Sequence, residues 1–189
     1  EADVLRESDD PADVGCYRWL GLLSDRFAGE QVAEPLAESV AQAFSMVGAH
    51  HEWFRWIYPD ALATARSEGH HEVTEQLLTM VEERPAGAFP PFVRAQAARY
   101  RGLHSADAGD LAGAEAPLLS ALGEFERMAF PYWAACTRVD LAEVLRRTGR
   151  DEEADRMDAE GRAALTAMGV GEILVGAAGA PAANNVARE

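Results

Sequence analysis

Apolar residues recur at helical spacing along the second half of the chain. Over residues 111–128 they stand three and four positions apart, on one face of an amphipathic helix: Leu111, Ala114, Leu118, Leu122 and Phe125. A looser stripe runs over 131–148, through Trp133, Val139, Leu141, Ala142 and Leu145. No segment shows sustained apolar–polar alternation, so strands have little support. The pattern predicts an all-α fold.

Prolines mark where these helices begin or break. Pro91 and Pro131 stand where a helix would start, and proline is tolerated in the first helical turn because the N–H it lacks has no partner there. We predict eight helices, at 13–28, 31–47, 51–67, 71–84, 91–107, 111–128, 131–148 and 151–168.

Glycines divide the chain into repeats. Gly29, Gly69, Gly109 and Gly149 lie 40 residues apart, each between two predicted helices. Glycine suits the end of a helix because a left-handed conformation costs it little. Fixed spacing of this kind predicts a repeat architecture.

The residues around the glycines agree best in the last two units. Pro91-Phe92 recurs as Pro131-Tyr132. Small residues recur seven before and twelve after the glycine, as Gly102 and Ala142 and as Ala121 and Gly161. Such residues let two helices approach closely. In the first two units Leu22 and Leu62 stand at the earlier small position, so those units match less well.

The third and fourth units resemble tetratricopeptide repeats. The positions that carry the resemblance are Gly102, Gly109, Ala114 and Ala121 in the third unit and Ala142, Gly149, Ala154 and Gly161 in the fourth. The resemblance implies a right-handed solenoid of about four antiparallel helix hairpins. A period of 40 instead of the usual 34 implies longer helices.

A second resemblance covers roughly residues 50–170. The segments 114–118, 137–143, 146–150 and 165–169 are similar to the C-terminal helical repeats of large actinobacterial signalling ATPases and transcriptional regulators. The resemblance implies a sensory or scaffolding part of such a protein. We expect a polar lead-in at 1–12, the repeat domain at 13–170 and a flexible tail at 171–189.

The amino-acid composition limits the classes of partner that the chain is expected to bind. The net charge is −15, and all 17 basic residues are arginine. Phosphate backbones and anionic membranes would repel such a chain, so we expect neither direct nucleic-acid nor membrane binding. Cys16 and Cys136 form no disulfide framework. That cysteine usage suits the cytoplasm, where we expect the protein.

Candidate chemistry is sparse. His50-His51-Glu52 and His70-His71-Glu72 contain metal-binding residue types, but antiparallel packing of their helices would separate them by about 25 Å. There is no lysine to complete a nucleotide-binding loop. Each cysteine lies in an apolar helical stretch typical of a buried thiol. We therefore predict no catalytic residue, no metal, no cofactor and no enzymatic activity.

Candidate partner-binding residues come from the first helix of each hairpin, which lines the concave face of such arrays. The repeat register assigns to this face Gln96, Arg99 and Leu103 from the third unit and Cys136, Val139, Glu143 and Arg146 from the fourth. Trp53 and Trp56, in a dense aromatic cluster, are further candidates; a bulky core is the alternative for them.

These features predict a non-catalytic module that binds a protein, a peptide or another domain of the same polypeptide. One alternative is a small-molecule sensor with its ligand near the aromatic cluster. A less favoured alternative is a metal-dependent enzyme that uses the histidine–glutamate pairs.

Overall fold

A computed structural model of the chain describes residues 8–170, and within them the fold is all-α with eight helices and no strand. The helices are α2 (Pro11–Phe27), α3 (Ala33–Val47), α4 (Glu52–Ser67), α5 (His71–Glu82), α6 (Pro91–Asp107), α7 (Leu111–Arg127), α8 (Pro131–Arg147) and α9 (Asp151–Ala167). All eight predicted helices are present, and no end differs from its predicted position by more than two residues. The predicted tail at 171–189 lies outside the described residues.

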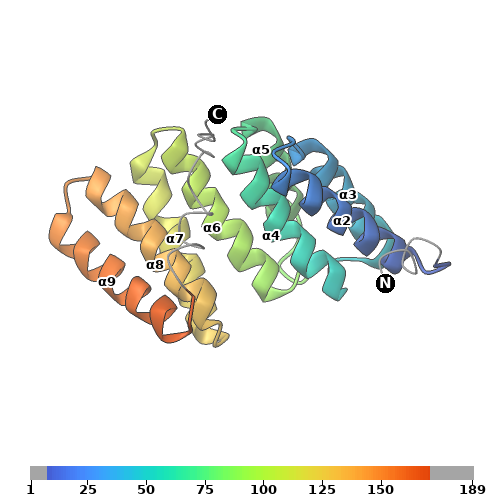
Figure 1. Ribbon diagram of the computed structural model, residues 1–189. Helices are drawn as coiled ribbons and strands as arrows, with labels where there is room; N and C mark the ends of the chain where they lie inside the picture. The colour runs from blue at the N-terminus through green and yellow to red at the C-terminus, as the bar shows by residue number, and fades with distance from the viewer. Residues whose placement is uncertain (1–7, 171–189) are drawn as a thin grey trace.

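The helices follow one another as a row from α2 at one end to α9 at the other (Figure 1). Helices adjacent in sequence pack together, and α2, α4, α6 and α8 also contact one another in series. Within this series α4 therefore lies between α2 and α6, and α6 lies between α4 and α8. Among the described helices, none combines the length and the apolarity needed to cross a membrane.

The first of the described helices, α2, begins two residues earlier than its apolar pattern predicts. Asp10 caps α2, its carboxylate accepting a hydrogen bond from the Ala12 N–H at 2.8 Å. Pro11 then occupies the first helical turn, where its missing N–H costs nothing. Part of the predicted lead-in is thus helical, because capping rather than hydrophobicity sets this end.

The four glycines at 40-residue spacing end α2, α4, α6 and α8, and each has a positive φ of 74–94°. The residue that follows each glycine donates a backbone hydrogen bond of 2.8–3.0 Å to the carbonyl five positions earlier. This is the bond of the Schellman motif, which satisfies carbonyls left unpaired at a helix end. The predicted helix-ending role of Gly109 and Gly149 is confirmed.

The same turn closes α7 without a glycine. Ala129 has φ 56°, and the Phe130 N–H donates to the Phe125 carbonyl at 2.9 Å. Gly169, 40 residues later, fills the equivalent place after α9 with φ 73°. Ala129 thus adopts a left-handed conformation that its Cβ disfavours.

Small residues bring paired helices into backbone contact. A Cβ built on Gly102 of α6 would lie 2.7 Å from the Ala114 carbonyl oxygen of α7 and 2.6 Å from Leu118 Cγ. A Cβ on Gly161 of α9 would lie 2.8 Å from the Ala135 carbonyl oxygen of α8. The close approach that the sequence predicts is confirmed at both glycines.

We predict that Gly102→Ala lowers the free energy of unfolding by about 1–3 kcal/mol, because the added methyl group must displace the backbone of α7. Gly123→Ala is the matched control. Gly123 is a helical glycine of α7 with nothing within 4 Å of its Cβ position, so alanine there should stabilise the fold by up to about 1 kcal/mol. Urea unfolding measures both; a loss at Gly123 equal to that at Gly102 would contradict the contact.

We predict that Ala129→Gly raises the free energy of unfolding by about 0.5–1 kcal/mol, since glycine relieves the left-handed strain. Ala108→Gly provides the control. Ala108 ends α6 with φ −75°, so glycine there adds only unfolded-state entropy and should destabilise by about 0.5–1 kcal/mol. The same sign for both variants in chemical unfolding would disprove the strain.

Candidate partner-binding groove

A groove of about 400 Å³ draws its walls from α2, α4, α6 and α8, with the end of α9 and Val170 at one side. Its lining is mixed, with aromatic rings, aliphatic side chains and four charged groups. The lining residues are Arg26, Phe27, Asp60, Ala63, Arg99, Tyr100, Tyr132, Trp133, Cys136, Val139, Asp140, Leu165 and Val170. No single pair of helices supplies all of these lining residues.

An ion pair joins α6 to α8 beneath this groove. Arg99 Nε lies 2.6 Å from Asp140 Oδ2, and the Arg99 side chain is only 4% exposed. The guanidinium carbon lies 5.2 Å from the centroid of the Tyr100 ring and 5.7 Å from that of Trp133. Burial opposes the charge of Arg99, but Asp140 outweighs that effect and raises the pKa of the guanidinium. Arg99 is therefore a permanently charged group that ties two helices together.

The other titratable groups of α6 and α8 in the groove stay neutral at pH 7. Burial raises the pKa of Tyr132 to about 12 and raises the pKa of Tyr100 as well. Burial also raises the pKa of the Cys136 thiol, against a smaller opposing effect of Arg99. A thiol with a raised pKa is a weak nucleophile. These groups can donate and accept hydrogen bonds to a partner.

The end of α2 supplies the exposed rim of the groove. Phe27 is 91% exposed, which is unusual for so large an apolar side chain. The guanidinium of Arg26 makes no hydrogen bond or ion pair with any residue of 8–170. Its charge acts instead on Asp60 of α4, whose pKa burial raises and Arg26 partly lowers. An exposed ring beside a guanidinium with no ion-pair partner among the described residues is a combination that protein-binding surfaces favour.

Of the residues predicted for the concave face, Arg99, Cys136 and Val139 line the groove. Gln96 and Leu103, at 0% and 5% exposed, are not among the lining residues. The buried amide of Gln96 finds no hydrogen-bond partner among the described residues.

The remaining predicted residues lie apart from the groove. Glu143 and Arg146 are exposed on α8, and Arg146 Nη2 lies 3.4 Å from Asp155 Oδ1 of α9. That contact directs Arg146 toward the neighbouring helix. Neither residue lines the groove.

The two tryptophans have different surroundings. Trp53 is 3% exposed, and its indole occupies the space where a Cβ on Gly15 of α2 would lie, with Trp53 Cη2 1.9 Å from that position. It therefore fills the core between α2 and α4, in line with the core alternative. Trp56 is 42% exposed, with the guanidinium carbon of Arg55 5.6 Å from its ring centroid. It too lies outside the groove.

The histidines serve helix ends and helix contacts. His51 caps α4, its Nδ1 accepting from the Trp53 N–H at 3.2 Å. The rings of His71 and His104 lie 5.7 Å apart, and His104 Nε2 is 3.5 Å from Glu75 Oε2. Over residues 8–170, no group of three or more His, Cys, Asp or Glu side chains is arranged to hold a metal ion.

Several groove residues were not predicted from the sequence, although the repeat register contains a signal for them. Asp60, Tyr100 and Asp140 all line the groove and stand 40 residues apart. Taking the position after Arg99 and stepping by the 40-residue period in both directions would have identified all three. Phe27 and Arg26 have no such signal, because only the stacking of α2 on α4 brings them to the rim.

We predict that Asp60 makes the fold less stable as pH rises. Because burial raises its pKa above the ordinary value of 3.8, the carboxyl contributes stability that is fully present below 3.8 and is lost as pH rises through the folded-state pKa. Asp60→Asn should therefore stabilise the fold more at about pH 7 than at about pH 3. Urea unfolding at both pH values measures the difference, with Glu143→Gln as a control for net charge. An equal effect of Asp60→Asn at both values would contradict the prediction.

Comparisons with known proteins return no matching family model, no matching curated protein and no matching solved structure.

Proposed function

We propose that the chain is a non-catalytic helical-repeat module that binds a protein segment in the groove of α2, α4, α6 and α8. In this proposal the eight helices form a right-handed, tetratricopeptide-like solenoid of about four antiparallel hairpins. The 40-residue recurrence of the turn glycines and the serial contacts of alternate helices support it.

The observation that carries the proposal is the shared lining of one groove. Each of the four alternate helices contributes, through Phe27, Asp60, Tyr100 and Tyr132 among others. Stacked repeats present such continuous surfaces to extended partners, because each repeat adds one strip to the same face. Aromatic side chains and arginine are also the residue types enriched at protein interfaces.

The chemistry of the groove favours recognition over turnover. Arg99 and Asp140 are already paired with each other, and burial raises the pKa values of Tyr132 and of the Cys136 thiol. Such groups can fix the orientation of a peptide through hydrogen bonds while the rings contact its side chains. The overall charge of −15 favours encounter with a basic partner.

The partner can be a separate protein, a peptide or another domain of the same polypeptide. The resemblance of the segments within 50–170 to the repeats of large signalling ATPases favours a sensory or scaffolding role in a bacterial regulatory protein. On this proposal the protein acts in the cytoplasm.

A small-molecule sensor is a second candidate, because a volume of about 400 Å³ lies within the range of small-ligand pockets. A small ligand would occupy the buried part of the groove near Tyr132 and Trp133. Phe27, at the exposed rim, would contribute less to such a ligand than to a peptide that crosses the groove.

We predict that Phe27→Ser weakens a groove-binding peptide at least tenfold, about 1.4 kcal/mol, because it removes an exposed aromatic contact without disturbing the core. Linear peptides would be selected from a displayed random library against the whole chain, and their affinities measured by calorimetry. Leu119→Ser is the matched control, since Leu119 is a 46% exposed apolar residue of α7 that does not line the groove.

Selected peptides that bind both variants as tightly as the native chain would reject the groove as the binding site. If no peptide binds and a metabolite raises the melting temperature, the sensor is the correct function. Ala63→Arg, which places a long side chain inside the groove, should then abolish that shift, whereas Ala116→Arg on the exposed part of α7 should not.

A further inference from the structure

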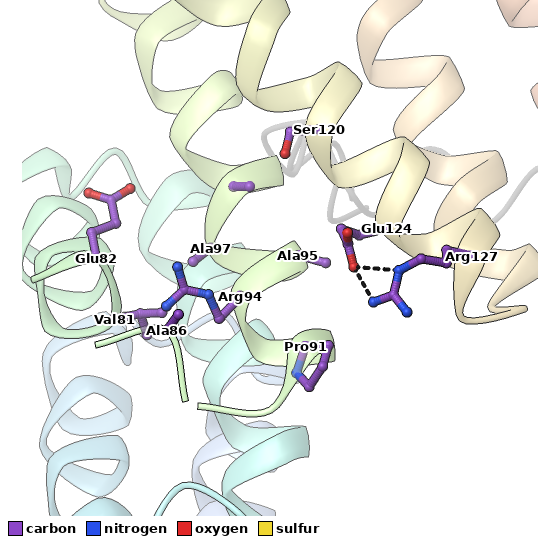
Figure 2. A pocket seen from close by; sticks show the side chains of 11 residues that line it. Val81, Glu82, Ala86, Pro91, Arg94, Ala95, Ala97, Ser120, Glu124 and Arg127 are labelled. Carbon is purple, nitrogen blue, oxygen red and sulfur yellow. Dashed lines mark hydrogen bonds and ion pairs between the residues drawn. The ribbon is translucent and has the colours of Figure 1, made fainter. Parts of the chain in front are cut away.

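A second pocket, of about 440 Å³, lies among the end of α5, the first half of α6 and the second half of α7 (Figure 2). It shares no residue with the groove. Its lining consists of small apolar residues and five polar ones. The lining residues are Val81, Glu82, Ala86, Pro91, Arg94, Ala95, Ala97, Ala98, Ser120, Glu124 and Arg127.

Arg94 is the exceptional residue of this pocket. Figure 2 shows its guanidinium extending between the α5 side and α6. Its Nη1 is buried without a hydrogen-bond partner, and the guanidinium makes no hydrogen bond or ion pair with any residue of 8–170. The Nη1 atom itself has almost no surface that a ligand could reach, so a ligand in the pocket would meet the rest of the guanidinium. That group carries a charge with no counterion among residues 8–170, which favours an acceptor in the pocket.

The carboxylates of the pocket are already paired with other arginines. Glu124 Oε2 lies 2.6 Å from Arg127 Nη2, an ion pair visible in Figure 2. Glu82 accepts hydrogen bonds from Arg101 Nε at 2.9 Å and Arg101 Nη2 at 2.6 Å. Neither carboxylate contacts Arg94. Arg94 is therefore the one cation of this pocket's lining that has no counterion within the described residues.

The rest of the lining determines the size and charge of an acceptor. The α6 side of the lining consists of small side chains, Ala95, Ala97 and Ala98, together with the apolar ring of Pro91. Glu82 and Glu124 would repel a multiply charged anion, since like charges at short range disfavour each other. A ligand with a single negative charge and a short apolar part meets both the size and the charge requirement of the pocket.

We propose that this pocket binds a small organic monocarboxylate. The carboxylate accepts hydrogen bonds from the guanidinium of Arg94, whose planar geometry matches it. The short aliphatic part lies against Pro91 and the alanines of α6, and the Ser120 hydroxyl is available to a second polar group. The site is separate from the groove and does not depend on the function proposed for it.

The test titrates sodium butyrate into the whole chain by calorimetry at constant ionic strength. The native chain should bind butyrate at least ten times more tightly than butyramide, which has the same shape without the charge. It should also prefer butyrate to inorganic phosphate. Equal binding of butyrate and butyramide, tighter binding of phosphate, or no butyrate binding at tens of millimolar would overturn the proposal.

Variants assign the binding to Arg94. Arg94→Gln should weaken butyrate binding at least tenfold, whereas Arg156→Gln, at an exposed arginine of α9 outside the pocket, should leave it unchanged. Ala98→Leu, which fills the pocket and keeps Arg94, should weaken binding to the same degree. Circular dichroism confirms that each variant is folded. Undiminished binding by Arg94→Gln or by Ala98→Leu would place butyrate elsewhere and overturn the site.

The control for the groove is Phe27→Ser, which should bind butyrate as the native chain does. The failure of either proposal then leaves the other intact, because the two sets of lining residues do not overlap.

Discussion

Backbone contact between paired helices sets the close packing of the two hairpins α6–α7 and α8–α9. A carbonyl oxygen of α7 lies 2.7 Å from the position that a Cβ on Gly102 would take, and a carbonyl oxygen of α8 lies 2.8 Å from that position on Gly161. Alternate helices also contact one another, so the stack is continuous from α2 to α8. Arg99 of α6 reaches Asp140 of α8 across one of these contacts, and both residues line the groove.

Two of the three arginines of α6, Arg94 and Arg99, show how one helix serves two surfaces. Arg94 and Arg99 are five residues apart, which turns their side chains about 140° from each other around the helix axis. Arg99 faces α8 and finds Asp140, so its charge is compensated. Arg94 faces α5 and α7, where the carboxylates are held by Arg101 and Arg127. On one side of α6 an arginine thus links two helices, and on the other side an arginine has no acceptor among the described residues.

Burial gives the groove its chemical character. On the α6–α8 side Tyr100 is buried and Tyr132 and Cys136 are half-buried, so their neutral forms are favoured and their pKa values rise. The opposite rim, at Phe27 and Arg26, stays open to solvent. A partner would therefore meet an exposed aromatic side chain first and a drier, hydrogen-bonding surface beyond it.

The sequence predicted helix positions and turn positions well because local rules decide them. Proline in the first turn, glycine after the last turn and an apolar stripe of helical period are properties of short segments. It predicted the concave-face residues less well. Arg99 and Val139 share a register position and do line the groove, but Gln96 and Leu103 are buried. By their spacing Gln96, Arg99 and Leu103 lie on one side of α6, so the spacing alone does not separate the groove residue from the other two.

The sequence by itself determined an all-helical chain, the 40-residue recurrence of its turns and the small residues at which helices meet. These follow from backbone conformation and from side-chain size, which are fixed residue by residue. Only the tertiary structure decided which charges are paired, that Trp53 is buried in the core, that Phe27 lies at the rim of a groove and that Arg94 has no acceptor among the described residues. Those properties depend on the distances between helices far apart in sequence, and electrostatic pairing and burial are functions of such distances.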